Sequence, residues 1–276
     1  MNTFKRKKRA LKDRKNPLLY AFWSMVNKIS ITMRFKDFQV FGRENIPKSG
    51  PFILVSNHIT RWDGLIVYES IGRPANFMVS PNELLGVQGE VLQSMGSFPA
   101  DPRADLINHS LQLFNKGEAV VVFPEGNIFR DGSTHPFKTG VAKIAAAALQ
   151  AGIDLPILAA ALHYKDNGQI ACMAVAEPIY ASQYLSTEKP EQESNTRNLK
   201  LLCERLHREV CFLRDGLGNS GDRLELFLGK PKKPALEMLL AAGAAEAGKA
   251  ESTLALTIVA QEKRLQGSSL PERKVS

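Results

Sequence analysis

The sequence has few cysteines, and their spacing indicates neither a metal site nor a disulfide framework. Cys172, Cys203 and Cys211 are the three cysteines among 276 residues, and no two of them form a C-x-x-C pair. So few scattered cysteines argue against a disulfide-rich secreted fold and a zinc knuckle. We therefore expect a reducing, cytosol-facing location and no metal.

Long apolar runs are also missing. A membrane-spanning helix needs about 18 to 20 consecutive apolar residues. The best candidate, residues 18–33, is interrupted by Asn27 and Lys28. A signal peptide is not indicated either, because no small-residue cleavage site follows the basic start. We expect a peripheral or monotopic protein at most.

Positive charge is concentrated in the first 15 residues. The chain has a net charge of +8, and residues 1–15 hold eight basic residues against Asp13, which is +7, so the remainder is close to +1. A short basic tail suits an anionic lipid surface or a nucleic acid, or serves only as a solvated arm. Because the rest of the chain is nearly neutral, no nucleic-acid partner is expected.

Residues 17–34 have the pattern of an amphipathic helix. Pro17 suits the first helical position. Apolar side chains recur at three- and four-residue spacing, at Leu18, Phe22, Val26, Ile29 and Met33. A basic arm that leads into such a helix is typical of an interfacial membrane anchor. The alternative is a helix that only covers the domain core.

Short apolar runs alternate with helical patterns from residue 35 onward. Strands are predicted at 35–42, 52–56, 76–80, 119–123, 155–163 and 170–176, and helices at 61–71, 106–116, 141–151 and 199–213. This alternation predicts an α/β fold with a mixed, mostly parallel central sheet flanked by helices. Residues 186–198 are expected to form a loop. We divide the chain into an arm and helix at 1–34, a domain at 35–229 and an Ala-rich tail at 230–276.

Histidine and aspartate follow the predicted strand 52–56 directly. Asn57-His58 leads to Asp63 five residues later. Histidine accepts a proton near neutral pH, and a carboxylate can hold its ring in one tautomer. Positions five apart point in different directions on a helix, so His58 must lie in a loop and Asp63 in the first helical turn. Without further context, an inert histidine at a helix start is the favoured interpretation of this pattern.

Two other segments carry candidate binding residues. Glu125 and Gly126 follow the predicted strand 119–123, and Gly126 would let the backbone approach a ligand closely. Arg103 could bind a phosphate in bidentate fashion. Arg130 and Lys138 could add positive charge after the acidic turn.

Together these segments resemble the glycerol-phosphate acyltransferases of the lysophosphatidic acid acyltransferase type. The family motifs correspond to Asn57-His58 through Asp63, Gly96 through Arg103, Phe123-Pro124-Glu125-Gly126 and Leu155-Pro156-Ile157. The resemblance covers roughly residues 35–180. Asn127-Ile128 stands where the family commonly has Thr-Arg, and the arginine of the second motif is displaced by an insertion.

The resemblance implies a function for these residues. His58 would act as general base on a glycerol hydroxyl that attacks an acyl thioester, and Asp63 would orient it. The acceptor would be held by Asn57, Arg103, Glu125, Gly126, Arg130 and Lys138. The expected reaction converts lysophosphatidic acid to phosphatidic acid with acyl-CoA or acyl carrier protein as donor. No cofactor is expected, and the partners would be membrane phospholipids at the cytoplasmic face of a membrane.

Two other functions fit the same pattern. The acceptor could be a different lysophospholipid or another alcohol, because the departures after Gly126 fall where the substrate would be recognised. A membrane-binding relative without catalytic activity is the other alternative.

Overall fold

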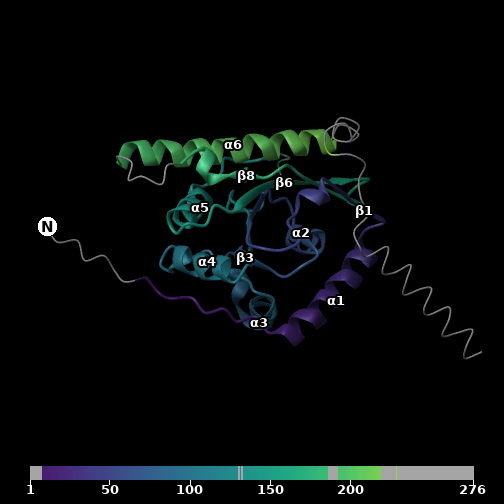
Figure 1. Ribbon diagram of the computed structural model, residues 1–276. Helices are drawn as coiled ribbons and strands as arrows, with labels where there is room; N and C mark the ends of the chain where they lie inside the picture. The colour runs from purple at the N-terminus through teal and green to yellow at the C-terminus, as the bar shows by residue number, and fades with distance from the viewer. Residues whose placement is uncertain (1–7, 130, 132, 186–191, 219–227, 229–276) are drawn as a thin grey trace, which may run out of the picture. The chain divides into compact units, whose positions relative to one another are not determined.

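The computed structural model describes residues 8–129, 131, 133–185, 192–218 and 228 (Figure 1). The chain forms two units, Met1–Pro234 and Ala235–Ser276. The predicted tail at 230–276 lies outside the described residues, so the domain boundaries stay predictions.

One mixed sheet forms the centre of the first unit. Its strand order is β1-β7-β6-β2-β5-β3-β4, with β8 paired to β6. All pairs are parallel except those of β6 with β7 and β8, which confirms the predicted fold class. The strands are β1 (Asp37–Phe41), β2 (Ile53–Ser56), β3 (Ala75–Val79), β4 (Phe98–Pro99), β5 (Ala119–Val122), β6 (Pro156–Lys165), β7 (Ile170–Val175) and β8 (Ile179–Tyr180).

Helices cover both faces of this sheet. They are α1 (Pro17–Arg34), α2 (Asp63–Ile71), α3 (Gly86–Ser94), α4 (Leu106–Asn115), α5 (Gly140–Gln150) and α6 (Gln192–Gly218), with short 3-10 turns at Arg43–Asn45, Pro81–Leu84 and Ala181–Gln183. Alternate strand residues such as Val55 and Val122 pack against α4, α5 and α6. Their neighbours, such as Leu54 and Val121, pack against α1 and α2. This alternation follows from the two-residue period of a strand.

Helix α1 packs its more polar side against the domain. Asn16 caps its start by accepting from the backbone N–H groups of residues 18 and 19. Asn27 and Ile31 are buried, whereas six large apolar side chains are exposed: Leu18, Leu19, Phe22, Met25, Ile29 and Met33. We call these six the apolar stripe. The stripe does not enter the core, and α1 covers the core with its other side, through Ile31. No helix in the described part of the chain is long and apolar enough to cross a membrane.

The described part of the basic arm, residues 8–16, lies along the domain. Arg9 donates its backbone N–H to the carbonyl of Arg103, and Arg14 pairs with Glu90 at 2.9 Å. Lys15 forms an ion pair with Glu118. Some of the arm's positive charge is therefore neutralised by the domain itself.

Three features differ from the sequence prediction. Helix α6 begins at Gln192, so a loop over residues 192–198 is wrong. That segment lacks an apolar period. Helix α3 and the two-residue strands β4 and β8 were not predicted.

Candidate active site

The predicted catalytic residues lie at one edge of the sheet. Strands β2 and β5 are parallel neighbours, so their carboxyl ends meet there. His58 follows the end of β2 by two residues, and Glu125 follows the end of β5 by three. The carboxyl edge of a parallel sheet is where α/β proteins usually bind ligands.

His58 and Asp63 are in direct contact. Helix α2 begins at Asp63, and His58 lies in the preceding loop, which is the arrangement that their spacing required. The Nδ1 atom of His58 lies 2.8 Å from Oδ2 of Asp63. Because a carboxylate only accepts, Nδ1 carries the proton and Nε2 is the ring nitrogen left to take one up. The imidazole also stacks on Phe123, with ring centroids 4.3 Å apart.

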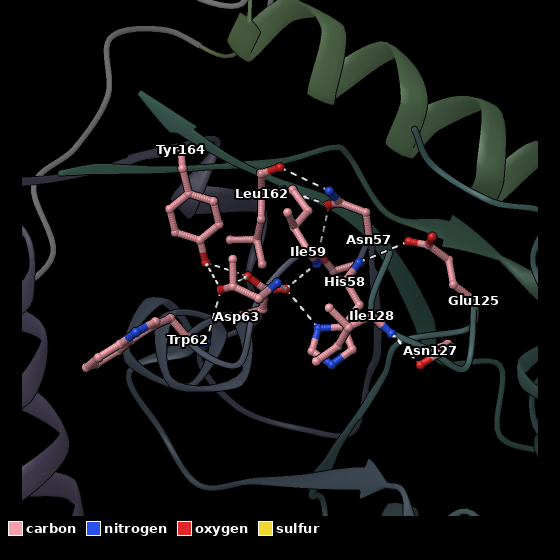
Figure 2. A network of polar contacts seen from close by, with 12 residues as sticks. Asn57, His58, Ile59, Trp62, Asp63, Glu125, Asn127, Ile128, Leu162 and Tyr164 are labelled. Carbon is pink, nitrogen blue, oxygen red and sulfur yellow. Dashed lines mark hydrogen bonds and ion pairs between the residues drawn. The ribbon is translucent and has the colours of Figure 1, made fainter. Parts of the chain in front are cut away.

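The Asp63 carboxylate is fully buried and accepts hydrogen bonds at both oxygens (Figure 2). Oδ2 accepts from His58 Nδ1 and from the backbone N–H groups of Ile59 and Thr60, at 2.5 and 2.8 Å. Oδ1 accepts from the hydroxyl of Thr60 at 3.0 Å and from the hydroxyl of Tyr164. Such a network offsets the cost of burying a charge and fixes the carboxylate against the imidazole.

Glu125 joins the His58 loop to the loop that follows β5. Its Oε1 accepts from the backbone N–H of His58 and its Oε2 from that of His135, both at 3.0 Å. The side chain is buried, and this burial raises the pKa of Glu125 despite both hydrogen bonds. Glu125 therefore holds the frame of the site, and its predicted contact with substrate stays a prediction.

Asn57 attaches the same loop to β6. Its Nδ2 donates to the carbonyl of Leu162 at 3.0 Å, and its Oδ1 accepts from the N–H of Leu162 at 2.8 Å. This amide continues the β2–β6 ladder one position beyond the end of β2. Both polar ends of the side chain have backbone partners, so the structure gives Asn57 a positioning contact; a contact with substrate stays a prediction.

The other predicted binding residues are less closely grouped. Gly126 has φ +73°, and the side chain of Lys138 lies so close that a Cβ on Gly126 would meet it. Arg103 follows β4, three strand spacings or about 14 Å along the edge from β2. Its guanidinium is 87% exposed and bonds to Asp101, which lowers the pKa of that carboxyl. Arg130 lies outside the described residues.

No group of His, Cys, Asp or Glu within the described ranges has the arrangement of a metal site. The contact between His58 and the buried Asp63 carboxylate supports proton transfer at His58 Nε2. The comparisons with known proteins bear on which reaction that is.

Residues 37–163 match the family model described as Acyltransferase. The matched segment contains β1 through most of β6, and with them His58, Asp63 and Glu125. The predicted resemblance to acyltransferases is thereby confirmed for this segment.

Curated relatives of this acyltransferase segment carry one activity in their names. A chloroplastic 1-acyl-sn-glycerol-3-phosphate acyltransferase of Brassica napus is 36% identical over 38% of this chain and 32% of its own length. One of Arabidopsis thaliana is 32% identical over 41% of this chain and 33% of its own length. One of Borreliella burgdorferi is 29% identical over 43% of this chain and 50% of its own length. The chain thus spans a third to a half of the relatives it matches.

A solved structure shares the fold. The crystal structure of the 1-acyl-sn-glycerophosphate acyltransferase from Thermotoga maritima superposes with a TM-score of 0.51 at 19% identity, covering 69% of this chain and 79% of that one. At this identity the likeness concerns the fold alone.

Sequence reasoning missed two side chains of the site. Phe123 was assigned to a strand, but its ring supports the imidazole of His58. Tyr164 lies one residue beyond the predicted strand 155–163. Tyr164 lies two residues after Leu162, so strand alternation would have placed both on the sheet face covered by α1 and α2. Nothing in the sequence, however, pairs Tyr164 with Asp63.

Proposed function

We propose that this protein transfers a fatty acyl group from an acyl thioester to the free hydroxyl of lysophosphatidic acid, giving phosphatidic acid. The observation that carries the proposal is the His58–Asp63 contact at the sheet edge within the acyltransferase segment. The names of the relatives support the acceptor, and the shared fold is consistent with it.

His58 acts as the general base in this reaction. Its Nε2 takes the proton from the acceptor hydroxyl as that oxygen attacks the thioester carbonyl. The new ester C–O bond forms, the C–S bond breaks, and the proton passes from Nε2 to the departing thiolate. The negative charge of Asp63 stabilises the imidazolium formed in between, and base assistance of this kind contributes about 10²- to 10⁴-fold in rate.

We also propose that the apolar stripe of α1 rests on a phospholipid surface. All six stripe side chains are exposed, between 46% for Leu19 and 84% for Met33. Burying one such side chain contributes about 1.5 to 3 kcal/mol, so even partial burial of six supports membrane binding. A peripheral position at the cytoplasmic face would bring the enzyme to its lipid acceptor.

Activity is tested with purified protein, lysophosphatidic acid in mixed vesicles, and acyl-CoA and acyl carrier protein thioesters as donors. His58→Ala should lower the rate by at least about 10²-fold. His163→Ala is the matched control, because His163 lies on β6 but on the face opposite Tyr164. Full activity of His58→Ala would overturn the mechanism.

Membrane binding is tested by vesicle sedimentation. Exchanging Phe22 and Ile29 for serine should weaken binding, whereas Leu201→Ser, an exposed apolar side chain of α6, should not. Equal binding of both variants would exclude the stripe as the docking surface.

The same assays separate the alternatives. Turnover with another lysophospholipid or alcohol, but not with lysophosphatidic acid, would favour a different acceptor. Normal vesicle binding without turnover on any donor would favour a non-catalytic relative.

A further inference from the structure

Most donors to the Asp63 carboxylate come from the loop that it caps. His58, Ile59 and Thr60 supply four of the five hydrogen bonds, and all three lie within five residues of Asp63. Contacts this local fix the carboxylate relative to its own loop, which reaches the sheet only indirectly, through Asn57 and Glu125. The fifth donor, the Tyr164 hydroxyl, comes from β6, 101 residues away in sequence.

Tyr164 is well placed to act as an anchor. Strand β6 runs beyond the end of β2, since Ser56 pairs with Ala160 and β6 continues to Lys165. In this extension β6 pairs with β7 on its other side, so Tyr164 stands on a supported strand. Figure 2 shows its ring reaching from the sheet toward Asp63. Its hydroxyl also lies 3.0 Å from the hydroxyl of Thr60.

The ring of Tyr164 is held in turn by the end of α1. Phe35, the residue that follows α1, stacks on Tyr164 with centroids 6.0 Å apart. Phe35 also packs against Trp62, whose ring meets it edge-on with centroids 5.6 Å apart. Trp62 immediately precedes Asp63. The guanidinium of Arg34 lies 4.9 Å from the Phe35 ring. Aromatic packing on this scale restricts where the phenol can point.

We propose that Tyr164 is a positioning residue, which aligns the Asp63 carboxylate with His58 by fixing it to β6. This inference rests on the proposed function, because it concerns the same catalytic pair. The phenol also stabilises the negative charge of Asp63 by donating a hydrogen bond to it. Burial and the neighbouring carboxylate raise the pKa of Tyr164, so it stays a protonated donor across the working pH range.

Removing the hydroxyl has a defined electrostatic consequence. Among the described residues, Glu125 lies at His58 and Arg34 lies beside Tyr164, and both are titratable groups near the pair. Tyr164→Phe leaves both of these in place and keeps the stacked ring. The carboxylate then accepts one hydrogen bond fewer, so its negative charge is less stabilised by donors. This strengthens its interaction with the protonated imidazole of His58. The acidic limb of the pH–rate profile should therefore move to higher pH.

The experiment is a double-mutant cycle of Tyr164→Phe and Asp63→Asn, measured as kcat and KM in the vesicle assay. Tyr164→Phe should lower kcat roughly 10-fold, as expected for loss of a hydrogen bond to a charged group, with KM unchanged. In the Asp63→Asn background the same change should cost clearly less, since the contact to Tyr164 is kept there but the charge that Tyr164 aligns with His58 is gone. Tyr184→Phe, a tyrosine after β8, is the control for loss of a phenol hydroxyl.

The possible outcomes separate the two proposals. Equal losses in both backgrounds, or a lower melting temperature with an unshifted pH profile, would overturn the positioning role. If wild-type protein shows no turnover, the proposed function fails, and the inference is then decided by an NMR titration of the His58 ring. Tyr164→Phe should displace that curve to higher pH, and an unchanged curve would overturn the inference.

Discussion

Replacing Asp63 by asparagine should separate the charge of the carboxylate from its hydrogen bonds. All three partners of Oδ2 are N–H donors, namely the ring of His58 and the backbone of Ile59 and Thr60. Both partners of Oδ1 are hydroxyls, from Thr60 and Tyr164, and a hydroxyl can donate or accept. An asparagine with its oxygen at the Oδ2 position and its NH₂ at the Oδ1 position keeps every contact.

The structure therefore predicts a small loss of stability and a large loss of rate. Neutral acceptors form hydrogen bonds about half as strong as ionised ones, so Asp63→Asn should cost about 1 to 3 kcal/mol of unfolding free energy. Asp63→Ala leaves the backbone N–H groups of Ile59 and Thr60 without an acceptor, which costs about 1 to 3 kcal/mol each. With the two hydroxyls included, the unfolding free energy should fall by about 3 to 6 kcal/mol. Both variants lose the counter-charge to the imidazolium, and kcat should fall about 10²- to 10⁴-fold.

Urea unfolding and acyl transfer, measured on the same preparations, test this reasoning. Asp105→Asn is the control, because Asp105 caps α4 and asparagine is an equally good cap. If Asp63→Asn unfolds at the same urea concentration as Asp63→Ala, the asparagine amide does not keep the contacts of the carboxylate, and this reasoning is wrong. If Asp63→Asn keeps activity within about threefold of wild type, Asp63 is not the counter-charge.

Two further predictions concern the turn after β5. Burial raises the pKa of Glu125, so the native state binds more protons than the unfolded state, and stability should fall as pH rises through the folded pKa. Urea unfolding between about pH 4 and 8 should show this fall in wild type and not in Glu125→Gln. The prediction is contradicted if wild type instead gains unfolding free energy relative to Glu125→Gln as pH rises. Gly126→Ala should lose about 1 to 2 kcal/mol, because φ is +73° and the new Cβ would meet Lys138. Gly140→Ala, where a Cβ meets nothing within 4 Å at the start of α5, should be neutral or slightly stabilising, and thermal unfolding measures both glycine variants.

The fold was largely predictable because each buried strand is a short apolar run with clear ends. Helix α1 agrees with its predicted bounds, since Asn16 and Pro17 mark its start and the apolar period continues to its end. The reversal between β6 and β7 follows from a tight turn in which Asp166, Asn167 and Gly168 all have positive φ. Helix α6 was underestimated because residues 192–198 are polar, and periodicity cannot reveal a helical segment without an apolar face.

The site was predictable only where its residues are close in sequence or follow strands. His58 and Asp63 were found because a five-residue spacing after a strand has few workable geometries. The contacts that tie this pair to the rest of the fold come from other strands: Glu125 after β5, and Leu162 and Tyr164 on β6. Such partners depend on strand order and register, which a single sequence does not specify.

The loop after Gly126 differs from the family pattern without disturbing this frame. The loop is bound to the site by backbone groups, since His135 donates its N–H to Glu125 and Phe129 donates its N–H to the carbonyl of His58. Their side chains form a separate group, in which His135 stacks on Phe129 at 3.7 Å and pairs with Asp131 at 2.8 Å. Side chains here can therefore vary without changing the catalytic pair.

His135→Ala tests that separation, because alanine retains the N–H that Glu125 accepts. The exposed pair with Asp131 contributes little, so unfolding free energy should stay within about 1 kcal/mol of wild type. The ratio of kcat/KM between lysophosphatidic acid and other lysophospholipids should change, while kcat with the best acceptor stays within about threefold, since the proton-transfer geometry at His58 is intact. A loss of kcat comparable to that of Asp63→Asn would mean that the His135 side chain belongs to the catalytic frame, and the loop could not then vary independently of the chemistry.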